Sequence, residues 1–171
     1  MIANILKHVM RWAVEKNGNV GYRGEDAKAW AYTIAAPDGS PYLSRLLLPR
    51  IRLPYLGTVR PMLHQFHRPD DDRELHNHPW ARAWSLILTG SYVEERLADP
   101  VTGTTATKIV RWFNALTDRD FHRVVSLHGD VFTLFVTGDR VQDWGFYDVG
   151  RDEFTPHRDF FKKKEMSQHV Y

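Results

Sequence analysis

Two histidines one residue apart, His76 and His78 in the segment HNHPW, are the side chains of this sequence best suited to hold a metal ion. In an extended segment residues i and i+2 point to the same face, so both imidazoles can be presented to one point. A third histidine, His122 in DRDFHRVVSL, opens a later segment with a strand-like pattern. The sequence therefore predicts one divalent metal ion on His76, His78 and His122.

The composition narrows what such a site can contain. The 171 residues include nine histidines and no cysteine, which excludes thiolate ligands, a cysteine nucleophile and disulfide bonds. Three neutral imidazoles leave a divalent ion with its full positive charge and with open positions for water, substrate or dioxygen. This arrangement suits Lewis-acid and oxygen chemistry. It favours Fe2+, with Zn2+, Ni2+ or Mn2+ as the other ions that such ligands accept.

The N-terminal residues predict one amphipathic helix. Residues 2–15 carry apolar side chains at helical spacing, and the pattern stops at Asn17 and Gly18, a pair typical of a helix end. The polar face of this helix is not strongly basic, so we expect it to pack against the rest of the protein or against a second subunit rather than on a membrane.

From about residue 30 onward the sequence predicts short strands separated by turns. Turn-forming residues lie at 37–40, 98–103, 128–130, 137–140 and 149–152. Many short strands with regular turns favour an antiparallel sandwich or barrel. We predict one domain over residues 1–171, with a helix within 1–17 and a barrel core over about 42–150. The predicted strands are 30–34, 43–48, 58–66, 84–88, 91–97, 107–113, 121–127, 131–136 and 144–149.

The segment HNHPWARAWSLILTG resembles the first motif of the cupin superfamily, to which it contributes His76, His78 and the closing Gly90. His122 takes the histidine position of the second motif. Several further segments between about residues 42 and 150 look like a group of small bacterial and phage cupin-like proteins. The resemblance implies an all-β double-stranded β-helix, which is a jelly-roll barrel, with a metal centre on the three histidines.

The sequence departs from the cupin motif at its carboxylate ligand, because Ala83 stands at the glutamate position. Glu94 or Glu95 on the next strand could replace it, and strand alternation allows only one of the two to point inward. Without a glutamate the three histidines are similar to the ligand set of thiol dioxygenases among the cupins. Glu94 is therefore a candidate for an additional ligand.

Other polar residues are candidates for the interior of the barrel. His64 alternates with Met62 and Phe66, so it is a fourth ligand, a substrate contact or a core histidine with its hydrogen bonds satisfied. Three arginines could anchor an anionic substrate if they face inward, and these are Arg82, Arg111 and Arg123. The acidic run at residues 70–72 lacks the glycine and distal glutamate of an EF-hand loop and is predicted to be a solvated turn.

These observations favour a metal-dependent enzyme that acts on a small molecule, with oxygenation ahead of isomerisation or hydrolysis. One alternative is a cupin without catalytic activity, which binds a ligand or serves as a structural part of an assembly. Another is a metal-free sugar-nucleotide epimerase, in which His76 would act as a base and Tyr92 as its paired acid. Metal content and oxygen uptake distinguish these alternatives.

The distribution of charged and apolar residues indicates which partners and which location to expect. The 23 basic and 21 acidic residues are interspersed and give a net charge of +2, with one basic run at 162–164. We therefore expect no nucleic-acid partner. No apolar run approaches the roughly 20 residues that cross a bilayer, and no signal peptide is recognised, so we expect a cytoplasmic protein. A homodimer is one arrangement that would cover the N-terminal helix.

Overall fold

The computed structural model describes residues 1–17, 30–36, 38–71 and 74–168, and the side chains as far as residue 162. Residue 37 of one predicted turn, residue 72 of the acidic run and the side chains of residues 163–164 of the basic run lie outside this description. In chain order the elements are α1 (Ile2–Asn17), β1 (Ala31–Ala35), β2 (Pro41–Leu47), β3 (Ile51–Leu53), β4 (Gly57–Phe66), β5 (Leu75–His76), β6 (Arg82–Asp99), β7 (Thr104–Val110), β8 (Phe113–Thr117), β9 (His122–Thr137), β10 (Gly145–Asp148), β11 (Glu153–Pro156) and α2 (His157–Gln168).

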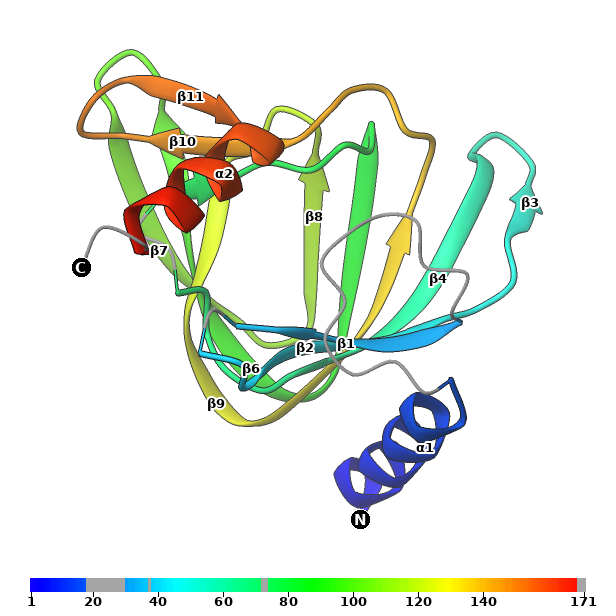
Figure 1. Ribbon diagram of the computed structural model, residues 1–171. Coiled ribbons are helices and arrows are strands. Elements are labelled where there is room, and N and C mark those ends of the chain that lie inside the picture. Colours follow the sequence, from blue (N-terminus) through cyan, green and yellow to red (C-terminus); the bar gives the residue numbers. More distant parts are fainter. Residues whose placement is uncertain (18–29, 37, 72–73, 169–171) are drawn as a thin grey trace.

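The strands form one antiparallel sheet that curves around a core. Strand β9 lies at its centre and pairs with β4, β5 and β6, while β6 also pairs with β7 and β8. In Figure 1 the strands β6 to β9 stand upright and β1 and β2 cross beneath them. The predicted all-β class with a short N-terminal helix is therefore confirmed.

Two long strands continue where the sequence predicted pairs of shorter strands. Strands β6 and β9 continue through Gly90 and Gly129, with shifts of register between them near Thr89. Gly90 has a φ of 67°, and a side chain there would meet the backbone oxygen of Asp130 at 2.7 Å. Only glycine fits such a close approach. The turn predicted at 128–130 is wrong, because glycine here bends a paired strand without ending it.

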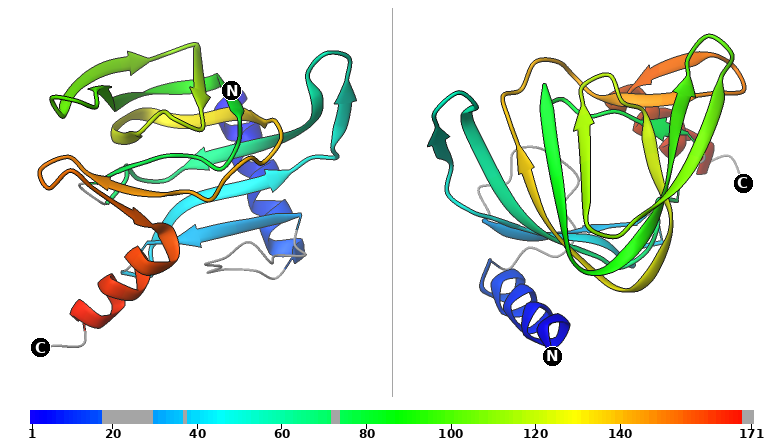
Figure 2. Two further views of the ribbon diagram at one scale, coloured as in Figure 1. Left: turned by 90° about the horizontal axis from the view of Figure 1, so that it is seen from above. Right: turned by 180° about the vertical axis from the view of Figure 1, so that it is seen from behind.

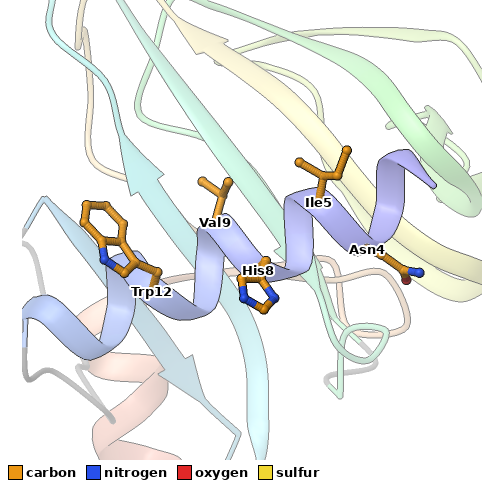
Figure 3. A pocket seen from close by; sticks show the side chains of 5 residues that line it. All are labelled: Asn4, Ile5, His8, Val9 and Trp12. Carbon is orange, nitrogen blue, oxygen red and sulfur yellow. The ribbon is translucent and has the colours of Figure 1, made fainter.

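Helix α1 packs on the outer side of β1 and β2, as predicted for a helix against the barrel (Figure 1). Met10 is 1% exposed and joins a cluster with Leu63 and Phe132. The other side of the helix stays apolar and exposed, and Figure 3 shows its side chains next to one another. They include Ile5, Val9 and Trp12, which are 57%, 41% and 55% exposed.

Four strands and one helix were not predicted. Strands β3, β5, β8 and β11 are short, and β3 forms a hairpin with β4 that extends away from the other strands (Figure 2). Helix α2 carries many charges, but Phe160 stacks on Phe146 and His157 stacks on Trp144. Tertiary contacts of aromatic rings hold this helix, and periodicity along the sequence does not reveal such contacts.

Candidate metal centre

The three predicted ligands come from two neighbouring segments of the sheet. His76 ends β5 and lies opposite His122, the first residue of β9, while His78 follows two residues after His76. One ligand atom from each of the three lies within 4.8 Å of the other two. The ring centroids are 5.2 Å apart for His76 and His78, 4.7 Å for His76 and His122, and 5.1 Å for His78 and His122.

One pair of ring nitrogens lies at a distance suited to sharing one ion. His78 Nε2 lies 2.9 Å from His122 Nε2. Two nitrogens that bind one metal at about 2.0–2.1 Å and at right angles to each other are separated by about 2.9 Å. Burial and the proximity of His122 and His76 hold the pKa of His78 well below its ordinary value of 6.5. A neutral ring is the form that ligates a metal.

Asn77 fixes the segment between the two histidines. This buried side chain donates from Nδ2 to the carbonyl of Asp118 at 3.1 Å and accepts from the backbone of Gly145 at 2.8 Å. Both bonds reach across to neighbouring segments of chain. They direct Asn77 away from the imidazoles and let His76 and His78 turn toward His122.

Glu94 lies behind His122 rather than among the three imidazoles. Its Oε1 is 2.8 Å from His122 Nδ1, and its side chain is completely buried. A carboxylate on Nδ1 favours the tautomer that carries its proton there and leaves the lone pair of Nε2 for a metal. Glu94 lies outside the group of ligand atoms that approach one another and is a partner of His122 Nδ1.

Glu94 is itself held by several groups. Arg96 and Lys108 lie 3.1 and 3.2 Å from its Oε2, and Asn114 donates to its Oε1 at 2.7 Å. Burial alone would raise the pKa of Glu94, but the contact with His122 and the charge of Arg96 lower it to about 2. The carboxylate is therefore ionised, although it is buried.

A second carboxylate approaches the metal-ligand candidate His76. Asp70 Oδ2 lies 3.8 Å from His76 Nδ1 and accepts the backbone N–H of Val124 at 2.7 Å. Tyr42 donates its hydroxyl proton to the other oxygen of Asp70. The side chain of Asp70 is 9% exposed, so the prediction of a solvated turn at 70–72 is wrong for this residue. Its folded contacts involve β2 and β9, which lie far from it in sequence.

The other residues predicted to line the interior, His64 and three arginines, lie outside the group of three histidines. His64 is 4% exposed and stacks on Phe135 with 4.9 Å between ring centroids, outside the group of ligand atoms. Arg82 and Arg111 are exposed, and Arg123 pairs with Glu95 at 2.6 Å. None of these three arginines is therefore placed as an anchor for an anionic substrate.

Tyr92, the acid required by the epimerase alternative, is 4% exposed, and burial raises its pKa to about 12. Its hydroxyl accepts from Asn114 Nδ2 at 3.2 Å, so it belongs to the group around Glu94.

No protein family model matches the chain, and no curated protein matches it in sequence. Solved structures do match it in part. One is an oxalate decarboxylase studied for its substrate binding mode, with 17% identity and a TM-score of 0.44 over 58% of this chain and 26% of that one. Another is oxalate decarboxylase from Bacillus subtilis at pH 4.6, with 17% identity and a TM-score of 0.41 over 57% and 25%. A third is Fe(II) HppE in complex with substrate, with 13% identity and a TM-score of 0.45 over 63% and 55%.

This chain spans about a quarter of the two oxalate decarboxylase chains and about half of the HppE chain. The likeness is confined to part of the arrangement of strands. In the part of the chain that the structure describes, neither helix is long and apolar enough to cross a membrane.

Proposed function

We propose that this protein binds one divalent metal ion on His76, His78 and His122 and acts on a small molecule at that ion. The observation that carries the proposal is the approach of three imidazoles, two of which have a carboxylate near their Nδ1. Imidazole ligands in metal sites commonly donate their second N–H to a carboxylate or a carbonyl. Two histidines that only packed in a core would not need this arrangement.

The residues around the three histidines have separate tasks in this proposal. Glu94 keeps the proton of His122 on Nδ1, while Asp70, at 3.8 Å from His76 Nδ1 and beyond hydrogen-bond distance, acts on that ring through its negative charge. Arg96 and Lys108 balance the charge of Glu94, so the ion keeps most of its own positive charge. When bound, the ion would supply a Lewis acid with open positions for substrate and dioxygen.

Among the reactions open to such a site we favour oxygenation with Fe2+. Neutral nitrogen ligands suit iron, and a three-histidine set leaves positions open for both reactants. Zinc, nickel and manganese remain alternatives that accept the same ligands. A ligand-binding protein without catalytic activity is the competing function, and it would hold the same ion without consuming dioxygen.

The test begins with elemental analysis of protein purified without chelator and without added metal. We expect about one ion per chain, which is lost on substitution His122→Ala while the far-ultraviolet circular dichroism spectrum is retained. Substitution of the exposed His128 by Ala is the matched control and leaves the metal content unchanged. Full occupancy in the His122→Ala protein would overturn the ligand assignment.

Oxygen consumption separates the enzyme from the binding protein. The iron-loaded protein is mixed with a library of small organic acids, amines and thiols, and dioxygen is followed with an electrode. Uptake that requires iron and His122 supports the oxygenase. Metal binding without uptake, together with saturable binding of a compound, would favour the protein without catalytic activity.

A further inference from the structure

A row of polar side chains crosses the inner face of the sheet near the three histidines. Arg45 on β2 lies opposite His64 on β4, and His64 lies opposite Thr133 on β9. Residues directly opposite each other in antiparallel strands have their side chains on the same face. The three side chains therefore form one continuous line across β2, β4 and β9.

The rows on both sides of this line are apolar. Two positions away along each strand, on the same face, the sheet carries hydrophobic side chains. One such row consists of Leu43, Phe66 and Val131, and the other consists of Leu47, Met62 and Phe135. Arg45, His64 and Thr133 thus place a guanidinium, an imidazole and a hydroxyl within an otherwise apolar interior.

Each of the three residues has a buried polar atom without a hydrogen-bond partner among the described residues. These atoms are Arg45 Nε, His64 Nε2 and Thr133 Oγ1. His64 and Thr133 are 4% and 0% exposed. Leaving a buried polar group unpaired costs about 1–3 kcal/mol, and folded proteins keep only a few such groups. The line is therefore suited to a ligand that satisfies all three.

The polar row is adjacent to the candidate metal centre. The ring of His64 stacks on Phe135, and the centroid of Phe135 lies 6.0 Å from that of His78. A small molecule that touched the row at one end could therefore reach the ion at the other.

The charges in this region favour an anion. Burial, followed by the charge of Arg45, holds the pKa of His64 well below 6.5, so His64 is neutral at pH 7 and Arg45 is positive. Among the described residues no carboxylate pairs with Arg45. The buried Glu94 already has its charge balanced by Arg96 and Lys108. Guanidinium groups bind carboxylate and phosphate oxygens with strong, directed hydrogen bonds.

We propose that Arg45, His64 and Thr133 bind the anionic oxygen group, a carboxylate or a phosphate, of the small molecule that reacts at the metal. This inference rests on the proposed function and names the substrate class for the same site. It assigns His64 as a substrate contact, which is one of the three roles that the sequence left open. Arg45 takes the anchoring role that Arg82, Arg111 and Arg123 do not fill.

The experiment measures binding of two probes, acetate and inorganic phosphate, to the metal-loaded and the chelator-treated protein by calorimetry. We expect one of the two probes to bind in the millimolar range, and the better probe identifies the anion as a carboxylate or a phosphate. Substitution Arg45→Gln is expected to weaken that binding about tenfold or more, because it removes hydrogen bonds from a charged donor. The exposed Arg82→Gln is the matched control and should bind the probe as the unaltered protein does.

Metal content is measured on each variant, which separates this inference from the proposed function. An Arg45→Gln protein with full metal content and unchanged probe affinity would overturn the anion site and leave the metal proposal intact. Absence of metal in the unaltered protein would overturn the metal proposal, and the chelator-treated samples would still decide the anion site. Failure of both probes to bind the unaltered protein overturns the inference.

A spectroscopic measurement on the unaltered protein covers the case in which Arg45→Gln does not fold. With 15N-labelled histidine, addition of the better probe should shift the ring nitrogen signals of His64, assigned through the His64→Asn variant. The exposed His128 should not shift. Unchanged His64 signals at saturating probe would contradict the proposed contact.

Discussion

Each of the candidate ligands His122 and His76 has a carboxylate near its Nδ1, but the two carboxylates have very different surroundings. Glu94 is completely buried in β6 and has polar contacts to His122, Arg96, Lys108 and Asn114. Asp70 lies in the loop before β5, at 3.8 Å from His76, with a backbone N–H and a tyrosine as its hydrogen-bond donors. One support is a charge network within the sheet, and the other is a single side chain on a loop.

This difference indicates which candidate ligand is held rigidly and which can change its position. Separating a buried charge from its partners costs free energy, so the side chains around Glu94 and His122 have one favourable arrangement. Asp70 lies on a loop and has fewer polar partners than Glu94, a backbone N–H and a tyrosine hydroxyl, so His76 can change its position at lower cost. We expect His122 to be held in place before metal arrives and His76 to be the ligand that adapts.

The largest effect is expected for Glu94→Gln. The substitution leaves Arg96 and Lys108 beside a neutral amide and removes the acceptor on His122 Nδ1. Breaking a buried charge network on one side costs about 3–5 kcal/mol, and loss of a carboxylate behind a metal ligand costs about 10–100-fold in metal affinity. Urea denaturation and competition with a chelator measure the two effects.

Glu95→Gln is the matched control for Glu94→Gln. Glu95 is adjacent in sequence and pairs with Arg123 on the other face of the strand, at 2.6 Å and with 19% of its side chain exposed. We expect a stability loss of about 1 kcal/mol or less and no change in metal affinity. Equal effects of the two substitutions on metal affinity would remove Glu94 from its supporting role.

The pH dependence of stability should follow the same network. The pKa of Glu94 is about 2 in the folded protein and 4.5 ordinarily, so the unfolded chain takes up its proton first as the pH falls. The stability that Glu94 contributes is fully present above about pH 4.5 and is lost as the pH falls toward 2. Urea unfolding at a series of pH values should therefore show a slope in this window that is smaller in Glu94→Gln.

An intermediate effect is expected for Asp70→Asn. The amide oxygen can still accept the N–H of Val124, but the negative charge near His76 is lost. We expect a loss of about 1 kcal/mol in stability and a decrease of metal affinity at or below the lower end of the range for such supports, about tenfold. Asp71→Asn, which changes a carboxylate paired with Arg68, is the control and should leave metal affinity unaltered. A larger loss of metal affinity in Asp70→Asn than in Glu94→Gln would reverse the comparison.

The sequence predicts the part of this molecule that local spacing determines. The i, i+2 spacing of His76 and His78 and the helix within 1–17 both follow from the periodicity of the chain. The positions of the two carboxylates cannot be predicted from this periodicity. His122 meets Glu94 through the register of β6 and β9, which shifts between Val93 and Glu94. The placement of Asp70 in a solvated turn failed for the same reason, since its donors belong to β2 and β9.

The smallest effect is expected for Tyr42→Phe, which removes one hydrogen bond from Asp70 and leaves its carboxylate in place. The bond to Val124 N–H still holds the other oxygen, so Asp70 should stay near His76. We expect a stability loss of about 0.5–1.5 kcal/mol and a change in metal affinity of less than about threefold. If Tyr42 acts on the metal through Asp70, its effect on metal affinity should disappear in an Asp70→Asn background, as a double-mutant cycle would show. An effect of Tyr42→Phe that persists unchanged in that background would mean that Tyr42 influences the site by another route, and the loop around Asp70 would then be only one of several supports for His76.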